Sequence, residues 1–196
     1  MSKENKTRCW WCGEDPIYIN YHDTEWGVPL RDDLKLFEML ILEGFQAGLS
    51  WITVLKKREN FRRAFFKFNP NKMAKMTEED IDRLMQDPGI IRNRLKIQAA
   101  RTNAKAYLEV KKEFGSFSEY LWQFTDNKTL VSKIRPTQKT IRATSAESDT
   151  MSKDLKKRGF KFVGSTICYA HMQATGMVDD HVSDCFKVKK LKARSR

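Results

Sequence analysis

The sequence of 196 residues contains no apolar run that approaches the ~20 residues needed to span a bilayer. Its first residues are polar, so we expect no secretory signal. We find no internal repeat, and patterns with the two-residue period of a strand are weak. These absences argue against membrane, secreted and repeat proteins. They predict an all-α protein in the cytoplasm with no membrane partner.

Cysteine and histidine are scarce, with four and three residues, so their spacing is informative. Disulfides are rare in the cytosol, which leaves metal binding or burial as the use of the thiols. Cys9 and His22 lie near the start of the chain, and His181 and Cys185 lie near its end. Two thiolates and two imidazoles are a typical structural zinc set. We therefore predict one zinc ion that joins the N- and C-terminal segments.

Cys12 competes with Cys9 for this role, because Cys9 and Cys12 have the C-x-x-C spacing of a zinc knuckle. Burial of the cysteines as small apolar residues, with ordinary polar histidines, also stays open. A catalytic zinc would keep one position for water, which four protein ligands do not leave. A zinc-dependent base deaminase would need H-x-E and P-C-x-x-C motifs, and the sequence has neither.

The chain carries 37 basic and 25 acidic side chains, a net charge of +12. Such an excess favours nucleic acid as partner, although a lysine-rich proteome would also produce it. Six of the last ten residues are basic. We predict disordered tails at residues 1–7 and 187–196, the second of which would strengthen DNA contact without sequence preference. Residues 8–186 would form a single domain.

Apolar residues recur at helical spacing along most of the chain. Residues 126–150 lack this period and are predicted to form a long surface loop. The predicted helices cover residues 33–45, 51–66, a short segment from Thr77, 91–110, 118–124, 152–158 and 166–175.

One carboxylate lies among aromatic and apolar residues. Glu43 follows an apolar helix face and precedes a turn rich in glycine. A carboxylate buried there needs a partner and marks a candidate site, whereas the alternative is an exposed glutamate at a helix end. The aromatic residues that we group with it are Trp11, Tyr18, Tyr21, Trp26 and Trp51.

Aromatic rings and an acid together suit a damaged base. A base that leaves the DNA stack loses stacking, which aromatic side chains replace at ~1–3 kcal/mol per base. Adenine methylated at N3 is cationic, so it gains cation–π attraction and charge-assisted bonds to Glu43 that normal adenine lacks. The same charge weakens the glycosidic bond, so a strong general acid is unnecessary. Glu43 would orient the base and stabilise cationic character in the transition state.

Several strings of residues resemble the 3-methyladenine DNA glycosylase I family. The likeness covers residues 8–186 and rests on long strings in one order, which is more specific than any single motif. These strings are residues 15–23, 25–29, 42–55, 89–94 with 96–97, 155–164, 166–169 and 180–181.

The resemblance implies a helix-hairpin-helix glycosylase fold. It implies monofunctional cleavage of the N-glycosidic bond in double-stranded DNA with an alkylated base, which leaves an abasic site and free 3-methyladenine. We expect a monomer with no cofactor besides zinc. The resemblance puts zinc on Cys9, His22, His181 and Cys185, and the base pocket on Tyr18, Tyr21, Glu43 and Trp51 with Trp11 adjoining.

For DNA contact, the resemblance implies that Gly48 and Leu49 form a wedge, with Leu49 filling the gap left by the extruded nucleotide. A hairpin at Gly89 would meet the DNA backbone, with Arg92, Arg94 and Lys96 nearby. The sequence lacks the second glycine of such a hairpin and a clear counterpart of the catalytic aspartate of the wider superfamily.

Trp10 and Cys12 lie outside the family pattern. His171 has no role in that pattern and is expected to be a surface residue of a helix. Two other functions compete with the enzyme. One is a DNA-binding protein that recognises distorted duplex without chemistry, and the other is a zinc-dependent interaction module whose basic charge is incidental.

Overall fold

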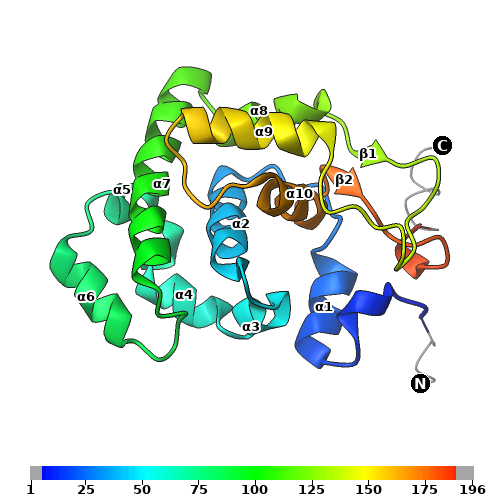
Figure 1. The fold of residues 1–196 in the computed structure, drawn as a ribbon, viewed down its shortest axis with the longest axis horizontal. Helices are drawn as coiled ribbons and strands as arrows, with labels where there is room; N and C mark the ends of the chain where they lie inside the picture. The colour runs from blue at the N-terminus through cyan, green and yellow to red at the C-terminus, as the bar shows by residue number, and fades with distance from the viewer. Residues whose placement is uncertain (1–5, 189–196) are drawn as a thin grey trace.

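A computed structural model describes residues 6–188 and shows a helical protein with one pair of very short strands (Figure 1). Residues 1–5 and 189–196, which make up most of the tails predicted at 1–7 and 187–196, lie outside the described residues. The elements are η1 (Trp10–Cys12), α1 (Pro16–Thr24), α2 (Asp33–Gln46), α3 (Trp51–Lys56), α4 (Arg58–Ala64), η2 (Phe66–Phe68), α5 (Pro70–Met73), α6 (Glu78–Gln86), α7 (Arg94–Phe114), α8 (Phe117–Trp122), η3 (Gln123–Thr125), β1 (Leu130–Val131), α9 (Ala146–Lys157), α10 (Ser165–Ala174) and β2 (Val178–Asp179), where η marks a 3-10 helix.

Helix α2 lies in the middle of the fold and packs against α3, α7, α8 and α10 (Figure 1). The Asp32 side chain begins the helix by accepting a hydrogen bond from the Lys35 backbone N–H. Every residue from 36 to 45 is buried. A helix that is buried all round also buries any polar side chain it carries, and this is why Glu43 is inside the protein.

Several helix boundaries differ from the prediction. The segment 51–66 is divided at Lys57 into α3 and α4, and Phe66 already has a positive φ of 54°. The long helix runs from Arg94 to Phe114 rather than over residues 91–110. Its start is set by Asn93, whose side chain accepts from the Lys96 backbone N–H.

The predicted loop at 126–150 is shorter than expected. Helix α9 begins at Ala146, where Ser145 and Ser148 form a reciprocal capping box. Strand β1 lies in the same segment and pairs in parallel with β2. Two-residue strands are too short to show an alternating pattern in sequence. Helix α1 was also not predicted, although Asp15 caps it and Pro16 is its first residue.

The prediction that His171 is a surface residue is wrong. Its ring in α10 is fully buried, and neither ring nitrogen has a hydrogen-bond partner among residues 6–188. Burial lowers the pKa of His171 to about 3, so the ring is neutral. Helix α10 packs against both α2 and α9, and a helix between two neighbours buries two faces instead of one.

The two ends of the described chain meet. The backbone N–H of Phe186 donates to the carbonyl of Thr7 at 3.0 Å, and Val188 is buried. Thr7 and Val188, which we assigned to the tails, therefore belong to the folded part. No helix in residues 6–188 has the length and apolar character to cross a bilayer.

Candidate functional site

A cavity of about 280 Å³ opens between α1, α2, α3 and α10. Glu43 and all five aromatic residues grouped with it in the sequence line this cavity. Its full lining is Trp10, Trp11, Tyr18, Tyr21, Trp26, Glu43, Gln46, Trp51, Ile141, Ala170 and Gln173.

Local structure positions these side chains. Tyr18 and Tyr21 are three residues apart on α1, which places them on one face. Glu43 lies in the last turn of α2, and Trp51 is the first residue of α3. The turn between the two helices thus brings an acid and an indole into the same cavity.

The rings form a connected cluster. The Trp11 and Tyr18 ring centroids are 5.0 Å apart, and those of Trp11 and Trp26 are 4.8 Å apart. Tyr21 and Trp51 are 5.5 Å apart. These distances lie in the range in which aromatic pairs attract, so the wall is rigid before any ligand enters.

Glu43 is 3% exposed, and its Oε2 has no hydrogen-bond partner within residues 6–188. The Trp51 Nε1 is likewise without a partner in that part of the chain. Burial raises the pKa of Glu43 to about 8, and burial together with the nearby Glu43 raises that of Tyr18 to about 12. Glu43 was expected from the sequence to be an anion, but in the free protein at pH 7 the neutral acid predominates.

Cys9, His22, His181 and Cys185 come together in a buried cluster. One ligand atom from each lies within 4.8 Å of the others. The Sγ of Cys185 is 3.5 Å from both His22 Nε2 and His181 Nδ1, and Cys9 Sγ is 3.5 Å from His181 Nδ1. A tetrahedral ion bonded at ~2.3 Å to sulfur and ~2.0 Å to nitrogen holds these atoms ~3.5 Å apart, so the residues fit zinc.

Neighbouring groups support this cluster. The Nδ1 of His22 is 2.8 Å from Asp23 Oδ1, which orients the ring as outer carboxylates do at metal sites. Asp23 also accepts hydrogen bonds from Arg8. Hydrogen bonds from Cys9 and the two imidazoles lower the pKa of the Cys185 thiol. Cys12, the alternative ligand, lies outside the cluster and donates from Sγ to the Cys9 carbonyl.

The proposed wedge lies in the turn between α2 and α3. Gly48 has a φ of +79°, which favours glycine, and Leu49 is 43% exposed. Gly89 lies in the turn between α6 and α7, but its N–H donates to Asp87 Oδ1 at 2.7 Å and so is already used within the protein. Arg92 is exposed.

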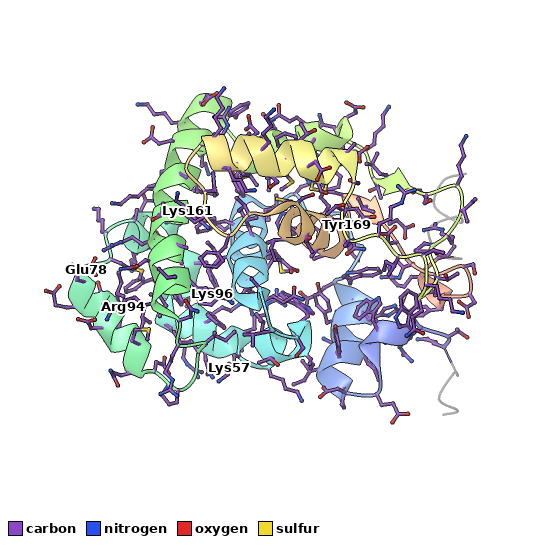
Figure 2. All side chains as sticks on the ribbon, in the orientation of Figure 1. Lys57, Glu78, Arg94, Lys96, Lys161 and Tyr169 are labelled. Atoms are coloured by element: carbon purple, nitrogen blue, oxygen red, sulfur yellow. The ribbon has the colours of Figure 1, made fainter. Side chains whose placement is uncertain are left out.

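The two remaining basic residues predicted near DNA, Arg94 and Lys96, lie in the first turn of α7 (Figure 2). Both make contacts within the protein. Arg94 is half exposed and pairs with Asp82 and Glu78. Lys96 is 7% exposed, and its Nζ donates to the carbonyls of Phe45 at 2.8 Å and Ala47 at 2.6 Å. The geometry does not fit a phosphate contact for Lys96, because its ammonium group binds the C-terminal end of α2 instead.

Five residues that line the cavity were not predicted from the sequence: Trp10, Gln46, Ile141, Ala170 and Gln173. Gln46 is three residues after Glu43, and Ala170 and Gln173 share a face of α10. Their spacing of three residues along a helix could have indicated that Gln46, Ala170 and Gln173 face the cavity. Ile141 comes from an irregular segment, and nothing in the sequence marks it.

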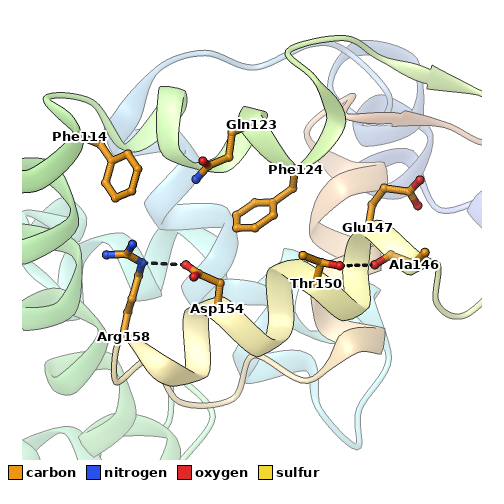
Figure 3. Close-up of a pocket in the computed structure, with 8 residues that line it drawn as sticks. All are labelled: Phe114, Gln123, Phe124, Ala146, Glu147, Thr150, Asp154 and Arg158. Carbon is orange, nitrogen blue, oxygen red and sulfur yellow. Dashed lines mark hydrogen bonds and ion pairs between the residues drawn. The ribbon is translucent and has the colours of Figure 1, made fainter.

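A larger cavity of about 430 Å³ lies beside α9 (Figure 3). Its charged groups bind one another, since Arg158 Nε donates to Asp154 at 2.7 Å and the guanidinium also pairs with Glu113. The Arg158 guanidinium also stacks on Phe114 at 4.8 Å. This arrangement stabilises the end of α9, and we assign it no ligand.

Known proteins similar to this chain agree in length and fold. This chain is 57% identical to DNA-3-methyladenine glycosylase 1 of Escherichia coli (strain K12). The match extends over 178 residues and covers 91% of this chain and 95% of that protein. It is 54% identical to the DNA-3-methyladenine glycosylase of Haemophilus influenzae (strain ATCC 51907 / DSM 11121 / KW20 / Rd), covering 91% of this chain and 96% of that protein.

Two solved structures have the same fold over nearly the whole chain. A crystal structure of a 3-methyladenine DNA glycosylase I superposes with a TM-score of 0.89 at 53% identity, covering 92% of this chain and 98% of that one. A Staphylococcus aureus glycosylase I, solved to explain 3-methyladenine recognition, gives 0.88 at 41% identity, covering 91% and 95%. The methyladenine glycosylase family model matches residues 11–188. The chain therefore belongs to the methyladenine glycosylase family.

Proposed function

We propose that this protein hydrolyses the N-glycosidic bond of 3-methyladenine in alkylated double-stranded DNA, releasing the base and leaving an abasic site. The main support is the Glu43 carboxyl group, which is buried against an aromatic cavity with one oxygen unpartnered among the described residues. The similar proteins are named for this activity.

The cavity suits a single base extruded from the duplex. Its volume of about 280 Å³ lies at the small end of ligand pockets. Trp11, Tyr18, Tyr21 and Trp51 offer ring faces that replace the lost base stacking. A cationic base gains additional cation–π attraction, worth up to ~2 kcal/mol when it is desolvated.

Glu43 adds selectivity through its proton. Its raised pKa of about 8 means that the free pocket holds mostly the neutral acid at pH 7. A cationic base favours the carboxylate, so its binding should release a proton below pH 8. Neutral adenine offers no charge to offset the burial of that carboxylate, so it binds less well.

The reaction needs little acid catalysis. Water adds its oxygen to C1′ and loses a proton, and the electron pair of the glycosidic bond moves to the base, which leaves neutral. Glu43 orients the base and stabilises its positive charge while the bond breaks. This role explains how hydrolysis proceeds without the aspartate that the wider superfamily uses.

We further propose that Leu49 occupies the space of the extruded nucleotide and that the hairpin at Gly89, with Arg92 exposed beside it, faces the DNA backbone. The protein would act as a monomer in the cytoplasm.

One zinc ion would bind to Cys9, His22, His181 and Cys185. When bound, it supplies a link between the two ends of the chain. Four protein ligands complete a tetrahedral shell and leave no position for water, so the site is structural.

Incubation with methylated DNA at neutral pH tests the function. We expect release of 3-methyladenine, detected by chromatography, with unmethylated DNA as control. Recovery of all methylated bases in intact DNA, together with tight binding, would instead identify a protein that recognises damage without chemistry.

A further inference from the structure

Residues 127–145 contain only basic charges. Among these 19 residues, Lys128, Lys133, Arg135, Lys139 and Arg142 are basic and none is acidic. A charge of one sign over so long a stretch repels itself, and a polyanion relieves this repulsion.

Part of this segment forms the wall between two cavities. Ile141 lines the base pocket, whereas its neighbours Thr140 and Arg142 line a second cavity of about 610 Å³. On the opposite wall, Gln173 lines the base pocket and donates from Nε2 to Asp180, which lines the second cavity. The two cavities are therefore adjacent.

The segment is anchored at its base. Strand β1 pairs with β2, and Arg135 binds the buried Asp179 through its carboxylate at 2.8 Å and its carbonyl at 2.9 Å. Arg135 is thus used within the protein. Lys133, Lys139 and Arg142 are exposed, and none of them has an ion pair within residues 6–188.

Two acidic residues also line the second cavity, the half-buried Glu147 and the buried Asp180. Asp180 is buried, and its Oδ2 accepts from Tyr169 at 2.7 Å and from Gln173 at 2.8 Å. The Asp180 carboxylate is therefore already used for hydrogen bonds within the protein. The exposed charges at the edge of the cavity, Lys133 and Arg142, are positive.

We propose that residues 132–145, the basic loop, bind the DNA backbone beside the extruded nucleotide, with Lys133 and Arg142 at its phosphates. The inference rests on the proposed function. An extruded nucleotide stays bonded to its flanking phosphates, which must lie near the mouth of the base pocket, where Ile141 places this loop. The loop after β1 and the pair α6–α7 lie at opposite ends of the long axis (Figure 1), so DNA would be held on both sides of the pocket.

The test compares two variants with the same loss of charge. Lys133→Ala with Arg142→Ala removes the proposed contacts. Lys105→Ala with Lys112→Ala removes two exposed lysines from α7, the second ~27 Å along the helix from Arg94. Binding to a duplex with a tetrahydrofuran abasic-site analogue is measured by fluorescence anisotropy at several salt concentrations.

In the basic-loop variant, the slope of log K against log salt should become shallower by ~1–2 units, at ~0.9 per lost phosphate contact. The α7 variant should keep the slope of the unmodified protein. Both variants should bind free 3-methyladenine and melt as the unmodified protein does, because Ile141 and the core are untouched. Equal slopes in the two variants would overturn the inference.

This outcome is distinct from that of the proposed function. If the unmodified protein releases no base but the loop variant loses slope, the loop contacts DNA and the enzymatic proposal fails. If base is released and the slope does not change, the enzymatic proposal stands and the basic loop is not a DNA contact.

Discussion

A fully buried carboxyl group such as Glu43 is costly to hold in the folded state. Its pKa of about 8 lies above the value of about 4.3 expected in the unfolded chain. The folded protein therefore binds an additional proton between these two pH values. The stabilisation that comes from this bound proton is complete below pH ~4.3 and is lost as the pH rises through 8. Selectivity for a cation thus lowers the free energy of unfolding of the free protein.

Glu43→Gln should remove both the loss of stability caused by ionisation of Glu43 and the selectivity for a cationic base. Because the amide cannot ionise, the free energy of unfolding should exceed that of the unmodified protein by on the order of 3 kcal/mol at pH 7. Base release should fall by ~10²-fold or more, since the charge that stabilises the cationic base is lost. Urea unfolding at pH 5 and pH 7 and the base-release assay measure these changes, and the difference in the free energy of unfolding should be smaller at pH 5. Undiminished base release would remove Glu43 from the site.

At the scale of elements, the turn between α2 and α3 connects the base pocket to the proposed wedge. Glu43 lies in the last helical turn of α2, just before this connection, and Leu49 is exposed within it. Lys96 from α7 binds the carbonyls of Phe45 and Ala47 and so holds the turn in place. A long helix thereby fixes the geometry of a short loop.

Lys96→Met tests this role. The side chain keeps a similar length but cannot donate, so two carbonyls lose their partner and the free energy of unfolding should fall by ~1–3 kcal/mol. The salt dependence of DNA binding should keep its slope, because no phosphate contact is removed. A stability equal to that of the unmodified protein, with a shallower salt slope, would restore Lys96 as a DNA contact.

At the scale of the whole molecule, the Cys9–His22–His181–Cys185 cluster joins both ends of the chain. His22 is on α1, which carries Tyr18 and Tyr21 into the base pocket. A metal at this cluster would fix α1 and the C-terminal segment together. It would therefore stabilise the pocket although it takes no part in the reaction.

Elemental analysis should find about one zinc per chain. Removal of the metal by a chelator, or Cys185→Ala, should lower the melting temperature and weaken binding of free 3-methyladenine, since α1 loses its link to the C-terminal segment. Cys12→Ala is the matched control and should keep the metal, because Cys12 lies outside the cluster. A metal-free protein of full stability would contradict the zinc proposal.

The sequence by itself determined the helical class and grouped Glu43 with five aromatic residues that line one cavity. It also selected His22, His181 and Cys185 for the Cys/His cluster and left Cys9 and Cys12 as alternatives for the fourth member. Helical periodicity and residue chemistry are local properties, so they can be read along the chain. The family resemblance decided between Cys9 and Cys12, and the structure places Cys9 in the cluster.

Only the tertiary structure decided which polar groups are used inside the protein. The sequence does not show that His171 is buried between two helices, that Lys96 binds two carbonyls, or that Ile141 reaches the base pocket. It also does not show that Glu43 is mostly neutral in the free protein. These properties depend on burial by segments far away in the chain, and burial sets both the charge of a group and the partners that it can reach.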